Sequence, residues 1–211
     1  EAELPSEVTA NPLRTIWMQH HRSFLRVIPI AGAMSLAYWT LLGAFPEMAI
    51  AAAVRTRQAW SAHTVGLLVM MMLLPVFAMA SDRFGRRMVL GGGLLAQAVV
   101  VVPALFVLET NPSLVILIQI VVAIPAAAIE GALYATLVEK FPARLRGVGM
   151  GLSMALGVAL LGGTSPLVQT AMTNIGIPLW GFGLYVLTVL LLAGFLAVRM
   201  PETAHKPLRT V

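Results

Sequence analysis

The stretch SDRFGRR, residues 81–87, lies between two long segments that carry no charge. Residues 58–81 end at the first residue of the stretch, and residues 88–108 follow its last residue. Neither segment contains Asp, Glu, Lys or Arg. A helix that crosses a bilayer needs about 20 apolar residues. The stretch therefore predicts a seven-residue cytoplasmic connection between two antiparallel membrane-spanning helices.

The composition of the whole chain agrees with a membrane protein. Of its 211 residues, 59% are hydrophobic and 11% are charged, whereas a soluble domain averages about 25% charged residues. The chain has no cysteine, which excludes disulfides, thiolate catalysis and cysteine-based metal sites. We expect an all-α membrane protein with no cofactor and no metal, and the absence of a G-x-x-x-x-G-K-[ST] loop argues against nucleotide use.

Uncharged segments recur along the chain and predict six spanning helices. The longest, residues 147–198, has room for two spans, and the turn-forming stretch TNIGIP (173–178) divides it. The six helices are expected near 26–46, 61–81, 88–108, 114–138, 148–171 and 179–199. The domain organisation is then a lead-in (1–25), a six-helix transmembrane bundle (26–199) and a tail (200–211).

The basic residues alternate with the predicted spans. Segments 1–26, 82–88, 139–146 and 199–211 hold 12 of the 14 Lys and Arg residues, and the opposite loops hold only Arg55 and Arg57. Cytoplasmic loops of membrane proteins carry an excess of Lys and Arg, so both termini are expected in the cytoplasm. Because the basic residues form no single patch, they favour contact with the lipid bilayer over nucleic-acid binding.

Within SDRFGRR, each residue type suits a turn at a membrane surface. Gly85 permits a turn without a Cβ clash, and the three arginines can anchor it against anionic headgroups. Asp82 can pair with Arg83 or Arg86, or cap a neighbouring helix. The simplest interpretation is a basic anchor with a compensating carboxylate, although an anchor alone requires neither Asp82 nor Gly85.

Two stretches resemble a known family of transporters. SDRFGRR resembles the D-R-x-G-R-R loop of the major facilitator superfamily, with Ala78 where that family usually has glycine, a change expected to loosen a close helix approach. VEKFPARLRGVGMGLSMALGVALLGGTSPLVQTAM (138–172) resembles a segment of the metabolite:proton symporter branch, and PEMAI (46–50) and PET (201–203) fit its C-terminal half. That branch carries proline, betaine, α-ketoglutarate, citrate, dicarboxylate and shikimate-type solutes.

The resemblance implies helices seven to twelve of a twelve-helix transporter, without helices one to six. It also implies a conformational latch in the cytoplasmic loops, facing the missing half. The latch residues that it implies are Asp82, Arg83, Gly85, Arg86 and Arg87, and Glu139 matches the acid of the E-x-F-P segment, near Arg144 and Arg146, as a gating or structural charge.

Glu130 interrupts the otherwise uncharged fourth span. An acid inside a membrane is costly unless it is paired, protonated or facing a wet cavity, and so it marks a functional site. Gln119 and Tyr134 are spaced to share its helix face, and Tyr38 and Trp39 lie within the first span. We consider these five residues candidates for proton or substrate contacts. The alternatives are a packing acid bonded to a neighbouring Ser or Thr, and ordinary packing for the two aromatic residues.

The sequence thus predicts one half of a proton-coupled transporter of a small organic acid or zwitterion in the bacterial inner membrane. Its expected partners are the solute, protons, lipid, and a missing N-terminal half or a second half-transporter. A transport-inactive fragment or an accessory half is an alternative. A membrane-embedded enzyme is a third, but no catalytic residues are predicted, since only Glu130 and His63 could contribute.

Overall fold

The computed structural model describes residues 12–202, and every regular element in that range is helical. The elements in chain order are α1 (Pro12–Gln19), α2 (His21–Tyr38), the π-helical turn η1 (Trp39–Gly43), α3 (Phe45–Ala51), α4 (Thr56–Phe84), α5 (Arg86–Thr110), the 3₁₀ turn η2 (Pro112–Leu114), α6 (Val115–Val138), α7 (Arg146–Gly157), the π-helical turn η3 (Val158–Gly162), α8 (Ser165–Asn174) and α9 (Leu179–Val198). The predicted lead-in and tail lie partly outside the described residues.

Six helical spans within the described residues are long and apolar enough to cross a membrane, which confirms the predicted number. They are His21–Gly43, Thr56–Phe84, Arg86–Thr110, Pro112–Val138, Arg146–Asn174 and Leu179–Val198. The first begins five residues earlier than predicted and ends at Gly43, because Pro46 starts the separate helix α3.

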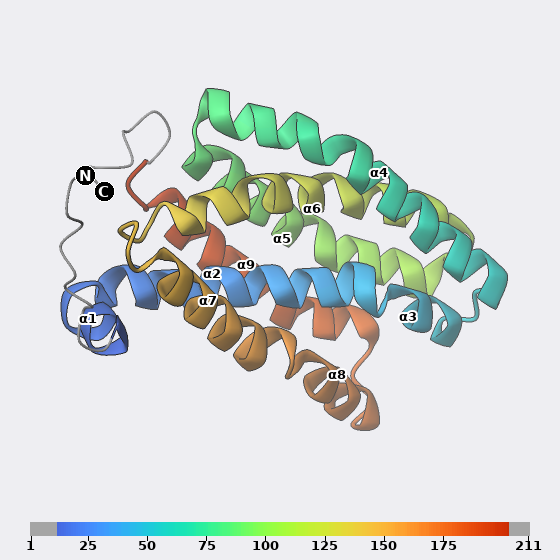
Figure 1. The fold of residues 1–211 in the computed structure, drawn as a ribbon. Coiled ribbons are helices and arrows are strands. Elements are labelled where there is room, and N and C mark those ends of the chain that lie inside the picture. The colour runs from blue at the N-terminus through green and yellow to red at the C-terminus, as the bar shows by residue number, and fades with distance from the viewer. Residues whose placement is uncertain (1–11, 203–211) are drawn as a thin grey trace, which may run out of the picture.

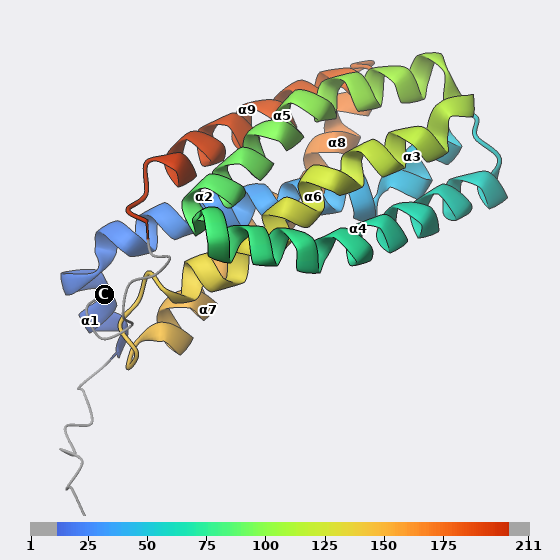
Figure 2. The same cartoon turned by 90° about the horizontal axis from the view of Figure 1, so that it is seen from above.

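The spans pack as a layered bundle. Figure 2 shows α4, α6, α5 and α9 side by side in that order, and each neighbouring pair is in contact. On the other side of the bundle, α2 packs against α7, η3 and α9 (Figure 1). Two glycines meet in this second layer: a Cβ added to Gly157 would lie 2.7 Å from the Gly32 nitrogen and 2.5 Å from the Ile28 carbonyl oxygen. Small residues allow helices in membranes to approach this closely.

The predicted seven-residue connection at 81–87 is wrong in its length. Helix α4 continues to Phe84 and α5 begins at Arg86, so Gly85 alone joins them. Gly85 has φ 104° and ψ 139°, a conformation that is essentially restricted to glycine. A single residue suffices because this conformation reverses the chain without a loop.

The expected effect of Ala78 also differs from the structure. A Cβ added to Gly131 of α6 would lie 3.0 Å from the Ala78 nitrogen, so α4 and α6 approach closely at this level. The small residue that allows the approach is supplied by α6 instead of α4. The glycine missing from the loop motif therefore does not loosen the packing here.

Both π-helical turns interrupt spans at the layer that contains α2. The turn η1 follows α2, and η3 separates α7 from α8 and ends at Gly162, the first residue of the stretch GGTSP (162–166). π-helical turns leave backbone carbonyls without their usual partners and are frequent at functional sites. The turn η3 divides the fifth span into α7 and α8, and η1 closes the first span before α3; α3 and α8 lie at the same end of the bundle (Figure 1).

Candidate functional site

The loop-motif residues meet two other segments at one end of the bundle, which we call the motif end. Arg86 is the centre of this contact. Its Nη2 lies 3.2 Å from Asp82 Oδ1, and its Nε lies 2.8 Å from Glu139 Oε2. The side chains of Arg86 and Glu139 are 18% and 12% exposed, and that of Asp82 is 65% exposed. The half-buried pair is therefore the stronger one, since exposed ion pairs contribute little.

A residue that was given no role in the sequence analysis completes this contact. Glu202 accepts hydrogen bonds from the backbone N–H groups of Arg86 (3.0 Å) and Arg87 (3.3 Å), the first two residues of α5. A carboxylate at a helix N-terminus satisfies unpaired N–H groups and interacts favourably with the helix dipole. The signal in the sequence was the acid of PET (201–203), which alone does not reveal its partner.

The segment after α6 is tied to the same tail. Lys140 Nζ donates a hydrogen bond to the Pro201 carbonyl at 2.7 Å. Arg146 Nε donates to the Phe141 carbonyl at 3.1 Å, within its own segment. Residues 82–87, 139–146 and 200–202 are thus joined into one network, which we call the ionic junction.

The remaining predicted latch residues lie at the edge of the ionic junction. Arg83 is exposed and its guanidinium lies 5.5 Å from the centre of the Phe84 ring. Arg144 is exposed as well. The sequence placed Glu139 near Arg144 and Arg146, whereas its ion pair in the described part of the chain is with Arg86.

Three of the five candidate residues in the spans come together on one face. Tyr134 lies one turn after Glu130 on α6, and Glu130 and Tyr38 of α2 are both close enough to Tyr134 to interact with it electrostatically. Tyr38 is 45% and Tyr134 48% exposed, and Glu130 is half-buried. We call these residues the mid-span cluster. Carboxylate and phenol groups at this depth can bind a proton or a polar solute.

Gln119 is separated from the mid-span cluster and buried in helix packing. It is 0% exposed and lies against Gly66 of α4. Its Nε2 donates a hydrogen bond to the Leu41 carbonyl in η1 at 3.2 Å. Within a span, a carbonyl released by a π-helical turn must find a partner in the protein. The predicted stripe of three polar residues is therefore divided, because the side chain of Gln119 bonds to the backbone of η1.

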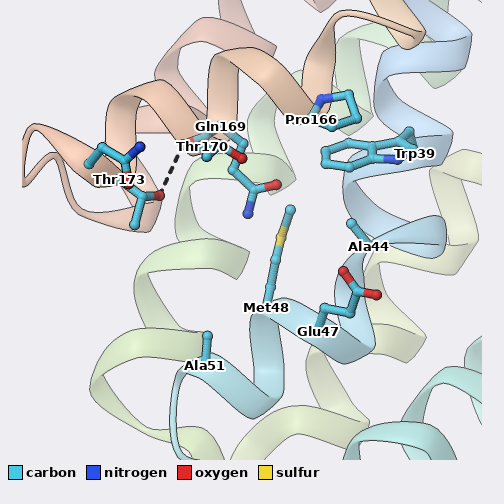
Figure 3. Close-up of a pocket in the computed structure, with 10 residues that line it drawn as sticks. Trp39, Ala44, Glu47, Met48, Ala51, Pro166, Gln169, Thr170 and Thr173 are labelled. Atoms are coloured by element: carbon cyan, nitrogen blue, oxygen red, sulfur yellow. Dashed lines mark hydrogen bonds between the residues drawn. The ribbon is translucent and has the colours of Figure 1, made fainter.

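Trp39, although it follows Tyr38 directly in sequence, lines a different site, nearer the end of the bundle opposite the ionic junction. It lines a cavity of about 280 Å³ between η1, α3 and α8. Figure 3 shows Trp39 beside Pro166, with Glu47 and Gln169 on the two sides of Met48. Glu47 belongs to PEMAI (46–50), and nothing in its sequence pattern pointed to a site. Within residues 12–202, no group of three or more His, Asp or Glu side chains could hold a metal ion.

Comparison with known proteins identifies the family. The sequence model of the Major Facilitator Superfamily matches residues 27–210. The chain is 32% identical to the ectoine/proline transporter ProP of Corynebacterium glutamicum over 90% of its length, and 30% identical to the alpha-ketoglutarate permease of Escherichia coli over 95%. It is 35% identical to the citrate-proton symporter of Klebsiella pneumoniae over 47% of the chain and 23% of that relative.

The chain spans 38% of the length of the first relative and 46% of the second. Its described residues form a helical bundle of six apolar spans, as expected of one half of a major facilitator fold. The chain belongs to the major facilitator superfamily, within its metabolite:proton symporter branch.

Proposed function

We propose that this chain is the C-terminal six-helix half of a proton-coupled transporter that moves a small organic solute across the bacterial inner membrane by alternating access. The related proteins named above transport ectoine and proline, alpha-ketoglutarate, or citrate with protons, which supports a small organic acid or zwitterion as the solute. The work comes from the electrochemical gradient, about 2.3 kcal/mol per charge per 100 mV.

The observation that carries this proposal is the exposure of the mid-span cluster. Tyr38 and Tyr134 expose almost half of their surface at a depth where lipid would surround a single six-helix bundle. Polar groups in hydrocarbon are costly unless they face protein or a wet cavity. A second six-helix bundle would cover this face and enclose a polar path between the two halves.

The exposure of whole helices supports the same second bundle. Helix α4 and the span from α7 to α8 are the least buried of the six spans. Their exposed side chains include Met72 and Met79 of α4 and Leu160 and Leu167 of the other span. Helix α4 packs against α6 and α7 packs against α2, the two helices that carry the mid-span cluster, so both spans offer surfaces for the N-terminal half.

The ionic junction is proposed as the part that holds the two halves in one state. Asp82 is 65% exposed at the motif end, and Arg86 links it to Glu139 and, through the backbone, to Glu202. An exposed acid on a fixed network can exchange partners with the second half as the halves rock. The motif end holds most of the basic residues, so it is the proposed cytoplasmic end.

Uptake measurements on the complete transporter, with the six upstream spans joined to this chain, test proton coupling. We expect Glu130→Gln to retain solute binding and to abolish the dependence of uptake on a pH gradient, because the amide cannot take up the proton. Glu109→Gln, which changes a carboxylate outside the mid-span cluster, is the control and should keep that dependence. If Glu130→Gln leaves the pH dependence unchanged, Glu130 is a packing residue.

The second candidate is an inactive fragment or an accessory half. It is favoured by the fact that the chain covers only 38% and 46% of the lengths of the first two relatives. Proteoliposomes that contain only the 211-residue chain distinguish it: accumulation of solute would require two copies to pair, and none would indicate that a separate half is needed. A membrane enzyme is the least supported alternative. Its two candidate residues, Glu130 and His63, are too far apart to act together. Glu130 is next to Gly131, which packs against Ala78 of α4. His63 lies 15 residues before Ala78 on the same helix, a distance of roughly 22 Å.

A further inference from the structure

The cavity that contains Trp39 has a lining unlike that of the rest of the bundle. One face of α8 supplies Pro166, Gln169, Thr170 and Thr173, whose spacing places them on one side of that helix. Helix α3 supplies Glu47 from across the cavity (Figure 3). The cavity opens at the end of the bundle opposite the ionic junction, which is the proposed outer side. A solute approaching from outside the cell would meet this surface first.

The charge of the lining is that of a single carboxylate. None of the residues that line the cavity is Lys, Arg or His, and Glu47 is its only acid. Among the described residues, no ion pair or hydrogen bond engages the Glu47 side chain. A carboxylate in this setting attracts a cationic group and repels a dicarboxylate.

The second acid at this end of the bundle behaves differently. Glu109 lines an adjoining cavity of about 500 Å³ that shares Met48 and Gln169 with the first. Its Oε1 accepts a hydrogen bond of 2.6 Å from the backbone N–H of Leu179, the first residue of α9. The charge of Glu109 is thus directed to a helix N-terminus, whereas that of Glu47 is directed to the cavity.

An aromatic ring and neutral polar groups complete the lining. The Trp39 indole offers a π-face, which among side chains attracts organic cations most strongly. The Gln169 amide and the Thr170 hydroxyl can bond to the oxygen atoms of a ligand. The volume of about 280 Å³ is at the lower end of the usual range for ligand pockets, about 300–1,000 Å³, so only a small solute fits.

We propose that Trp39, Glu47 and Gln169 form an outer binding site for a small solute with an ammonium group, cationic or zwitterionic. Glu47 and Trp39 bind the ammonium group, and Gln169 with Thr170 binds the other end of the solute. This inference rests on the proposed transport function and narrows its substrate to ammonium compounds, with dicarboxylates and tricarboxylates rejected at this site.

Isothermal titration calorimetry on the 211-residue chain in lipid nanodiscs tests the site, with glycine betaine as the ammonium probe and α-ketoglutarate as the anionic probe. We expect saturable binding of betaine and none of α-ketoglutarate. Trp39→Leu should weaken betaine binding by roughly 2- to 30-fold, the range of a cation–π contact. Glu47→Gln should weaken it by about fivefold or more, because two opposite unit charges about 4 Å apart attract each other by about 1 kcal/mol in water and by about 4 kcal/mol near a protein surface.

Glu109→Gln is the matched control, because it removes the same charge at the same end of the bundle while leaving this cavity intact. Betaine affinity should stay within a factor of two of the unmodified chain. Trp39→Phe keeps an aromatic face and should lose less affinity than Trp39→Leu. The proposal is overturned if betaine does not bind, if Glu47→Gln leaves its affinity unchanged, or if α-ketoglutarate binds equally well.

A separate measurement distinguishes failure of this site from failure of the transport function. If the complete transporter accumulates α-ketoglutarate while the chain fails to bind betaine, the outer site is refuted and the transport function stands. If the chain binds betaine with the expected losses but the complete protein accumulates no solute, the outer site stands and the transport function is refuted.

Discussion

Replacing Gly85 with alanine tests the ionic junction at the residue that makes its turn. Gly85 alone joins α4 to α5, with φ 104° and ψ 139°. An alanine Cβ at this position would lie 2.6 Å from Glu202 Oε2. The substitution therefore strains the backbone and also displaces the carboxylate that caps α5.

The two effects can be assessed separately. A non-glycine residue held in a sparsely populated backbone region costs about 1–3 kcal/mol. Loss of a helix N-terminal cap costs about 0.5–2 kcal/mol. Together we expect the free energy of unfolding to fall by about 1.5–5 kcal/mol. At roughly 2–4 °C per kcal/mol for a chain of this size, the Tm should fall by roughly 3–20 °C.

The measurement is thermal unfolding of the purified chain in detergent micelles, followed by circular dichroism and by size-exclusion of heated samples. Gly92→Ala is the matched control, because Gly92 lies inside α5 and a Cβ there meets no atom within 4 Å. Alanine in a helix interior is favoured over glycine by roughly 0.5–1 kcal/mol, so the control should be as stable as the original chain or more so. Equal Tm values for the two variants would refute the reasoning.

Three further predictions concern other contacts and use the same unfolding measurement. Glu139→Gln should lower the free energy of unfolding by about 1.5–3 kcal/mol, because it removes the charged partner of the half-buried Arg86 guanidinium. Asp82→Asn changes an exposed ion pair and should lower it by less than about 1 kcal/mol. Equal losses for the two variants would contradict this difference. Gly131→Val should lower the free energy of unfolding by about 1–3 kcal/mol, because its Cβ would lie 3.0 Å from the backbone of α4. Gly151→Val is the control: a Cβ at Gly151 meets no atom within 4 Å, so this variant should lose less stability than Gly131→Val. Gln119→Leu should cost about 1–3 kcal/mol by leaving a carbonyl of η1 without its partner, and an unchanged Tm would show that this hydrogen bond is dispensable.

The sequence by itself determined the class of the protein and its number of spans. Uncharged segments of about 20 residues, the stretch SDRFGRR and the segment 138–172 led to six helices and to the correct superfamily. Each of these features is local, because insertion into a bilayer depends on the hydropathy of one segment at a time. The pairing of Asp82 with Arg86 was equally accessible, since the two residues are only four positions apart in sequence.

Only the tertiary structure decided which distant residues meet. Glu202 caps α5 from 116 positions away, and Gln119 bonds to a carbonyl 78 positions earlier. Glu47 faces α8 across a cavity that neither segment forms alone. Hydropathy does not encode such contacts, because all six spans are apolar on most sides and the bilayer exerts little preference for which faces pair. Small-residue packing, π-helical turns and helix-end charges fix those pairs, and they act only once the helices are side by side.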